Sequence, residues 1–318
     1  MKQILTFKGL VDLAYNKYKS RNAVTIDKEY AKNINYFNYR FDIYSLARAI
    51  KSKINSNKVA IISENRYEFI VTFLANIMLR NTVIIIDNNL NQNMMTKIIK
   101  KYNINTIFFS DSNKSKILEI FKNNIKKKKL NLVNFDSNNK FPIIEYEKLI
   151  NLGRYIEDYS ADNMTDAEEK NNNIIIANLE GTKEYTQQDF IISAHLIGKN
   201  LKLKKKKEMQ ADTDINTFYK VVIKIILPLI YGLNIQFKTC DNQINKNNVE
   251  IVKEEKNKTT VQYRGNKYLI QNSNADTYIL KIEDHLLKKA DKEDVPNFIL
   301  IRSNKKEKLK NNKKSVII

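Results

Sequence analysis

Hydrophobic positions between residues 58 and 110 form short apolar runs separated by helical patterns. The runs are continuous and mostly β-branched, at residues 59–62, 82–86 and 104–109. Between the runs, apolar residues recur every three or four positions over 65–79 and 91–102. Continuous apolar strands are typical of a sheet with both faces buried, and helical links of this length favour parallel pairing. The pattern therefore predicts a parallel α/β sheet over residues 58–110.

Polar residues at the edges of the apolar patterns predict where several helices begin. Asn65 with Glu68, and Thr186 with Asp189, have the spacing of a capping box, and Asn91 is a helix N-cap of the usual type. The alternating segment Phe37–Phe41 predicts a strand. After it, Asp42 is expected to cap a helix with its apolar face at Ile43, Leu46, Ala47 and Ile50.

Polar segments divide the rest of the chain. Further strands are predicted at Leu130–Phe135 and Leu233–Phe237, and a helix at Phe218–Leu229. The expected domains are residues 1–241, with subregions 1–157 and 171–241, a linker at 242–260, and a small α/β appendage at 261–318. In this tail we expect strands near Val261 and Tyr268, a helix at Ile282–Lys289 and a strand at Asn297–Ile301.

Charge and composition limit the classes of partner. The chain has 318 residues, a formal net charge of +20 and six glycines. Such a charge suits nucleic acid or an acidic membrane surface. The excess of positive charge comes from Lys rather than Arg, however. The planar guanidinium of Arg is better suited than a Lys ammonium to paired hydrogen bonds with phosphates and base edges. A lysine-rich solvated surface is the simpler interpretation, so nucleic acid is not expected as a main partner.

Cysteine and hydropathy patterns exclude further classes. Cys240 stands alone, which excludes internal disulfides and cysteine-based metal clusters, and no metal-ligand spacing is seen elsewhere. The longest apolar run, Val221–Leu233, contains Lys224 and Pro228 and is too short to span a bilayer. The amino-terminal residues have no long apolar segment of the signal-peptide type. These features predict a cytoplasmic protein with no membrane span.

Residues 173–186, NIIIANLEGTKEYT, are the segment closest to a ligand-binding motif. They predict a buried strand, a tight polar turn that holds Gly181, Thr182 and Lys183, and a helix start. Strand, glycine turn and helix is an arrangement that binds phosphate. The turn is short and has a single glycine, so it is read as a phosphate loop, the remains of one, or an ordinary loop.

Three segments together resemble adenylate-forming enzymes, the family of acyl-CoA synthetases, luciferases and peptide-synthetase adenylation domains. Val59–Arg66 with the helix and strand that follow it is similar to the family's first α/β unit. Leu227–Gly232 resembles the helix and turn downstream of its phosphate loop, and residues 173–186 stand where that loop is found. The resemblance covers residues 7–240 and implies the family's α/β fold, with Gly181, Thr182 and Lys183 as nucleotide-binding residues.

A weaker likeness extends into the tail. Gly265–Ile270, then Asp276 and Ile282-Glu283, is similar to the family's hinge into its small carboxyl-terminal lid. The resemblance implies that Asp276 occupies the hinge carboxylate position. No residue of the tail matches the family's catalytic lysine, so no catalytic residue is assigned.

The resemblance implies a reaction, and the departures from the family pattern put it in doubt. The implied chemistry joins a carboxylic or fatty acid to CoA or a carrier-protein thiol, using ATP and Mg²⁺. The phosphate loop is about four residues short, and no counterpart is seen for the glutamate that helps to hold Mg²⁺. We therefore expect a degenerate, shortened, acyl-CoA synthetase-like protein with impaired or lost carboxylate activation. A working ligase, a non-catalytic partner-binding remnant and a basic nucleic-acid-binding protein remain as alternatives.

Four other side chains have chemistry to consider. Asp87 follows a predicted strand, where α/β sheets place functional groups and where strand-end caps are equally common. His195 lies in the helix after residue 186 and is read as a partly buried structural residue. Asp284 and His285 are neighbours in sequence, so they do not share a helix face and are not read as a dyad.

Overall fold

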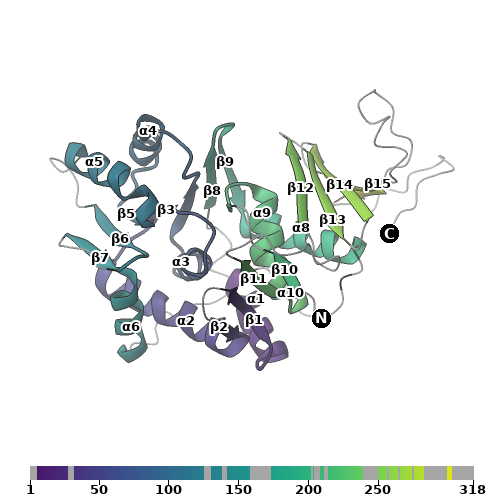
Figure 1. Cartoon of the computed structure of the whole chain (residues 1–318), viewed down its shortest axis with the longest axis horizontal. Helices are drawn as coiled ribbons and strands as arrows, with labels where there is room; N and C mark the ends of the chain where they lie inside the picture. Colours follow the sequence, from purple (N-terminus) through teal and green to yellow (C-terminus); the bar gives the residue numbers. More distant parts are fainter. Residues whose placement is uncertain are drawn as a thin grey trace.

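In the part of the chain that the structure describes, the strands form three sheets, of seven, four and five strands (Figure 1). The computed structural model describes residues 6–27, 32–124, 130–137, 142–157, 173–201, 203, 208–210, 214–238, 250–255, 258–263, 266–273, 276–282 and 299–302.

The largest sheet has seven strands in the order β7-β6-β5-β3-β4-β8-β9. Its members are β3 (Lys58–Ile62), β4 (Thr82–Ile86), β5 (Thr106–Phe109), β6 (Asn131–Asn134), β7 (Ile143–Glu145), β8 (Asn173–Asn178) and β9 (Gly181–Thr186). All neighbours pair in parallel except β8 and β9, which are antiparallel. The parallel sheet predicted for residues 58–110 is confirmed, and β3 lies between β4 and β5.

Helices cover both faces of this sheet. Along β3, Val59 and Ile61 belong to one hydrophobic core, and Ala60 and Ile62 to a second core on the opposite face. The second core is closed by α4 (Gln92–Tyr102) and α5 (Lys114–Asn124). Because side chains alternate along a strand, a sheet covered on both faces requires apolar residues at every position. This requirement explains the unbroken apolar runs.

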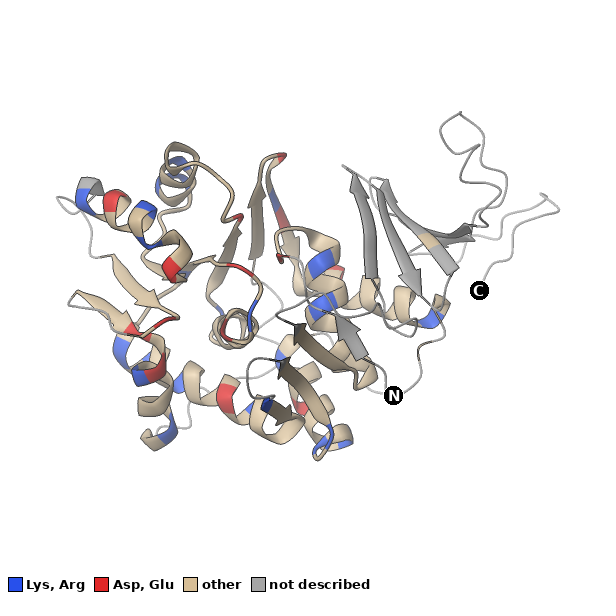
Figure 2. Ribbon diagram, in the orientation of Figure 1, with Lys and Arg blue, Asp and Glu red and all other residues tan. Residues whose placement is uncertain are grey.

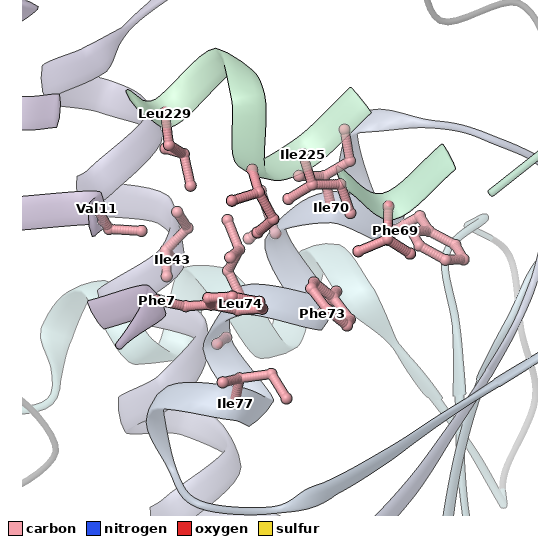
Figure 3. Packing of buried hydrophobic residues seen from close by; sticks show 14 of the residues in the cluster. Phe7, Val11, Ile43, Phe69, Ile70, Phe73, Leu74, Ile77, Ile225 and Leu229 are labelled. Atoms are coloured by element: carbon pink, nitrogen blue, oxygen red, sulfur yellow. The ribbon is translucent and has the colours of Figure 1, made fainter. Parts of the chain in front are cut away.

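The first core is the larger one and joins segments that are far apart in sequence (Figure 3). Phe7 of α1 (Phe7–Tyr18) has its ring centroid 5.9 Å from that of Phe73 in α3 (Tyr67–Met78). Ile43 of α2 (Tyr36–Ala49) and Ile225, far along the chain from it, lie in the same cluster. A π-helical turn (η1, Ile50–Ile54) extends α2. Helix α6 (Tyr146–Tyr155) packs against α2.

Close backbone contacts at two glycines fix this packing. A Cβ on Gly153 in α6 would stand 1.8 Å from the Ser45 carbonyl oxygen in α2. A Cβ on Gly198, in α8 (Gln187–Asn200), would stand 2.1 Å from the ring of Tyr231. Helix α8 continues through Gly198, where glycine leaves room for the Tyr231 ring.

The helix predicted at Phe218–Leu229 is built in three pieces. They are α9 (Phe218–Val221), a π-helical turn (η4, Val222–Ile226) and α10 (Leu227–Tyr231). Gly232 ends the last piece with φ 66°, a left-handed conformation that favours glycine. The chain then enters β11 (Asn234–Lys238), where a strand was predicted. The four-stranded sheet has the order β10-β11-β1-β2, and its other members are β1 (Asn22–Asp27), β2 (Lys32–Asn35) and β10 (Glu208–Gln210).

Two local predictions are wrong. Phe37–Phe41 is helical rather than extended, because Asn35 caps α2 by accepting from the Asn38 backbone N–H at 2.8 Å. Asp42 therefore lies inside this helix and does not cap it. Asn65 does not cap α3 either: the N-cap position is Arg66, which makes no side-chain cap hydrogen bond. The capping boxes and caps predicted at Thr186 and Asn91 are confirmed.

The described part of the tail is a five-stranded antiparallel sheet in sequence order. Its strands are β12 (Glu250–Glu255), β13 (Lys258–Tyr263), β14 (Asn266–Ser273), β15 (Asp276–Ile282) and β16 (Ile299–Arg302). β12 and the start of β13 occupy part of the segment 242–260 that was expected to be a linker. Ile282, the expected start of a helix, ends β15, and residues 283–289 lie outside the described residues. The polar segment 158–172 also lies outside them.

Candidate functional site

Gly181, Thr182 and Lys183 lie in a β-hairpin and not in a glycine turn. Strand β8 pairs with β9 from Asn173↔Thr186 to Asn178↔Gly181, so only Leu179 and Glu180 lie outside the ladder. The expected turn containing Gly-Thr-Lys is wrong in this respect, since those three residues begin β9. A two-residue connection is the shortest usual hairpin loop. It forms here because the Asn178 carboxamide oxygen accepts from the Glu180 backbone N–H at 3.0 Å.

The side chains of the hairpin point to a structural role. Thr182 accepts a hydrogen bond from the Lys101 ammonium at 3.2 Å, which ties β9 to the end of α4. Lys183 is exposed, and Leu179 at the tip is 72 % exposed. Gly181 has φ +121°, and a Cβ there would meet no atom within 4 Å. Backbone conformation, and not close approach to another group, accounts for this glycine.

Asp276, the residue expected at the hinge, is the first residue of β15. It pairs with Ser273 across the β14–β15 hairpin and with Arg302 on the other side. The backbone at this position is thus part of an antiparallel ladder. Its role as a hinge stays a prediction.

The topology of the large sheet points to a different place for a site. Helix α3 follows β3 and packs into the first core, whereas α5 follows β5 and packs into the second. The connections after these two adjacent strands therefore leave toward opposite faces. In open α/β sheets, ligands bind at the carboxyl ends of strands where this reversal occurs.

A hydrogen-bonded group of side chains fills this reversal point. Glu64, two residues after β3, accepts from the hydroxyls of Ser110 at 2.6 Å and Ser112 at 3.0 Å. Both serines follow β5, and Ser110 is buried. Partial burial alone would raise the pKa of the Glu64 carboxyl. The hydrogen bonds from the two serines, with the nearby Arg66 charge, outweigh it and lower that pKa below its usual value.

Arg66 joins this group to the next strand. Its guanidinium lies 3.3 Å from a Glu64 oxygen, 2.8 Å from Glu68 and 2.9 Å from Asp136, which follows β6. Burial opposes the positive charge, but Glu68 and Asp136 outweigh it and raise the pKa of Arg66 above its ordinary value. Asp136 also accepts from the Asp111 backbone N–H at 2.8 Å. We call Glu64, Arg66, Glu68, Ser110, Ser112 and Asp136 the switch-point network.

Asp87, at the carboxyl end of β4, is an anchor between elements. It is buried, and its two oxygens accept from the side chains of Asn89 at 3.1 Å and Asn216 at 2.9 Å. Lys220 donates to the Asn216 carboxamide at 2.9 Å. These bonds fix the start of α9 against the sheet edge, which favours the strand-end cap over a catalytic acid.

In the switch-point network the Glu64 carboxylate does lie next to a hydroxyl, since it accepts from Ser110 at 2.6 Å. Its lowered pKa makes it a weak base, and Ser112 and Arg66 also bond to it. His195 lies on the exposed side of α8, where partial desolvation lowers the pKa of its imidazole. The imidazole is thus partly desolvated, as expected, and its structural role stays a prediction. Within the described ranges, no three His, Cys, Asp or Glu side chains are grouped to hold a metal ion.

The sequence contained a signal for the switch-point network. Polar residues directly follow each of these strands, as Ser63-Glu64 after β3, Ser110–Ser112 after β5 and Asp136 after β6. Only Asp87 had been singled out, because strand order was not known before the structure. In the part of the chain that the structure describes, no helix has the length and apolarity of a bilayer span.

No protein-family model matches the chain, and no curated protein matches it in sequence. Its fold does match solved structures. The apo structure of MbtA from Mycobacterium smegmatis superposes with a TM-score of 0.60 and 11% identity, over 75% of this chain and 44% of that one. A fatty acyl CoA synthetase of Mycobacterium tuberculosis matches with a TM-score of 0.59 and 11% identity, over 78% and 47% of the two chains.

A third match has a bound adenylate. The anthranilate CoA ligase AuaEII, solved in complex with anthranoyl-AMP, gives a TM-score of 0.59 and 12% identity over 73% of this chain and 45% of that one. The present chain thus spans somewhat less than half the length of these three structures. At this identity the likeness is one of fold. The chain has the mixed α/β fold, with a large parallel sheet, of the amino-terminal domain of adenylate-forming enzymes.

Proposed function

We propose that this chain is an adenylate-forming-ligase-like protein that has lost carboxylate activation and acts by binding. The observation that carries the proposal is the two-residue connection between β8 and β9. The sequence resemblance puts the nucleotide-binding loop at this connection. A loop that surrounds a triphosphate needs several free backbone N–H groups and glycines that allow them to converge.

The hairpin fits such a ligand poorly. The backbone N–H of Glu180 is already bonded to Asn178, and Gly181 to Thr186 are in the ladder with β8. Lys183 lies on an exposed edge strand, and the Lys101 ammonium beside it is already bonded to the Thr182 hydroxyl. Removing one electrostatic contact to a transition state costs about 10²–10³ in rate. The loss of several such contacts would abolish useful turnover.

The switch-point network supports the same conclusion from the other side of β4. Its carboxylates are bonded to Ser110, Ser112 and Arg66, so a ligand would have to break these bonds before binding there. A network satisfied by its own members stabilises the fold and contributes little to recognition. The proposed binding function therefore belongs to an outer surface.

The competing proposal is a working ligase, and the fold favours it. In that case the cofactors would be ATP and Mg²⁺, and the substrates a carboxylic or fatty acid and the thiol of CoA or a carrier protein. Gly181, Thr182 and Lys183 would then contact the nucleotide, and a lid turning about Asp276 would complete the site.

Calorimetry with ATP and Mg²⁺, together with pyrophosphate exchange over a panel of carboxylic acids, separates the two. We expect no exchange above background and no ATP binding tighter than about millimolar, an affinity of about 4 kcal/mol. A micromolar dissociation constant that is lost in Lys183→Ala, and kept in the control Lys97→Ala on α4, would overturn the proposal.

A further inference from the structure

Two phenylalanines on α2 are exposed beside basic residues of α1. Phe37 is 43 % exposed and Phe41 is 41 % exposed, and they lie one helical turn apart on the same side of α2. The end of α1 lies against them, because the Phe37 backbone N–H donates to the Lys19 carbonyl at 3.1 Å. We call Tyr15, Lys19, Phe37, Arg40 and Phe41 the α1–α2 patch.

Rings and cations alternate across the patch. The Lys19 ammonium lies 5.6 Å from the Phe37 ring centroid and 5.4 Å from that of Tyr15. Arg40 lies 4.9 Å from the Tyr15 centroid and 4.0 Å from that of Tyr44. The Tyr15 and Phe37 rings are tilted, with centroids 6.0 Å apart. These contacts hold the Phe37 ring in place beside Tyr15, so this part of the patch is a preformed surface.

The charge of the patch is positive. The acidic residue Asp12 lies next to the patch, and its carboxylate forms ion pairs with Lys8 at 3.3 Å and with Arg40 at 2.7 Å. Among the described residues, Lys17 and Lys19 at the end of α1 are exposed and make no ion pair. Elsewhere, Lys and Arg occur together with acidic residues on α5, α6 and α8, whereas α4 has lysines and no acidic residue (Figure 2). The α1–α2 patch differs because the exposed Lys19 accompanies exposed phenylalanines.

We propose that the α1–α2 patch docks the protein on an anionic lipid surface. Aromatic and apolar side chains enter the headgroup boundary, while neighbouring lysines attract anionic headgroups. Both parts are present here within two helical turns. The proposal is independent of the lost carboxylate activation, and it gives a use to the positive charge that the fold does not explain.

The ring geometry favours lipid over single-stranded nucleic acid. A base needs a free ring face on which to stack. The faces of Tyr15 and Phe37 are partly occupied, because Lys19 and Arg40 lie over the rings. Phe37 and Phe41 are nevertheless 43 % and 41 % exposed, and an apolar ring enters a lipid layer without needing a free face on which to stack. Two phenylalanines alone would bind weakly, so attraction by lysine is expected to be required.

Flotation with lipid vesicles tests the proposal. The full chain is mixed with vesicles of phosphatidylcholine alone, and with vesicles that contain about 30 mol % phosphatidylglycerol, at low and at high salt. We expect binding only to the anionic vesicles and weakening by salt. Phe37→Ala with Phe41→Ala should lower the partition coefficient about tenfold, and Lys19→Glu about fivefold.

Two controls have comparable changes on other surfaces. Leu179→Ala removes an exposed apolar side chain from the hairpin tip, and Lys97→Glu reverses an exposed charge on α4. Both should bind like the unmodified chain, and circular dichroism confirms that each variant is folded. Fluorescence anisotropy with a single-stranded oligonucleotide is measured alongside.

The outcomes are decisive. Binding to anionic vesicles that falls in both patch variants and in neither control supports the proposal. Absence of vesicle binding, or equal loss in patch and control variants, overturns it. Oligonucleotide binding that requires Phe37 and Lys19, without vesicle binding, would overturn it in favour of nucleic acid.

Discussion

The segment after β3 and the hairpin between β8 and β9 lie on the same edge of one sheet but are built in opposite ways. After β3, side chains from three strand ends meet around Arg66 and Glu64. In the hairpin, two residues close the connection, and a backbone ladder supplies nearly all of the hydrogen bonds. One region is held by side chains and the other by backbone.

The difference shows where polar residues do and do not indicate binding. Glycine and lysine in residues 173–186 suggested a ligand, yet the backbone there is satisfied by its own ladder. The polar residues after β3 had been read only as a helix start and as part of the family resemblance, and those after β5 had not been singled out. Both nevertheless occupy the place where such sheets bind ligands. The charges of the residues after β3 and β5 neutralise one another, so these residues stabilise the fold, as the hairpin ladder does. The two regions differ in how much stability they contribute.

Removal of Arg66 should have the largest effect. Arg66→Ala would leave Glu64, Glu68 and Asp136 close together without a cation, and loss of one partner of a largely buried ion pair is strongly destabilising. The Arg66 side chain is 18% exposed, so we expect a loss of about 3 kcal/mol in the free energy of unfolding. Urea denaturation measures this loss.

Arg154→Ala is the matched control for that measurement. Arg154 also pairs with a carboxylate, Asp42 at 2.9 Å, but its side chain is 40% exposed. Exposed pairs contribute at most about 1 kcal/mol. If Arg66→Ala lowers the free energy of unfolding no more than Arg154→Ala does, the switch-point network does not have the central role that its geometry indicates.

A smaller loss is expected from Asn178→Ala at the hairpin. The Asn178 side chain accepts from the Glu180 backbone N–H at 3.0 Å and donates to the Asn216 carbonyl at 3.2 Å. Two such bonds correspond to a loss of about 1.5 kcal/mol on substitution. Asn200→Ala, which removes one bond within α8, should cost less. Equal losses in the two variants would show that the turn is held by its ladder alone.

The parallel sheet could be predicted because its strands are unusually clear in sequence. Each is a β-branched run that must be apolar at every position, and Asn91 marks a helix between two of them. The segment Phe37–Phe41 misled the prediction because its aromatic residues alternate as in a strand. Tyr36 and Tyr39, three residues apart, are both buried, and this helical spacing becomes visible only when the core is known.

The candidate site depended on information that a sequence pattern does not contain. Glu64 and Ser110 are 46 positions apart and meet because β3 and β5 are neighbours. Strand order is set by tertiary packing, so the contact could not be foreseen from either segment alone. At the hairpin the pattern predicted β8 and the helix start at Thr186 correctly, but it missed strand β9, because residues 181–183 were taken for a turn.

The smallest effect concerns the charge of Glu64 and is seen most clearly as a dependence on pH. In Glu64→Gln the amide oxygen can still accept from Ser110 and Ser112, so only the charge is lost. The side chain is 43% exposed, and we expect a loss of about 1 kcal/mol or less near neutral pH. The pKa of Glu64 is lower in the folded protein than in the unfolded chain, so its charge stabilises the fold above the unfolded value.

That contribution is lost as the pH falls from the ordinary glutamate pKa, 4.5, through the lower folded value. The other carboxyl groups titrate in both proteins, so their effects cancel when the two are compared. The difference in unfolding free energy between the unmodified chain and Glu64→Gln should therefore shrink below that pH. Ser110→Ala, which removes the shortest bond to Glu64, should make the difference smaller at neutral pH. A difference that stays constant or grows in acid would mean that Glu64 is not stabilised as a carboxylate by the switch-point network.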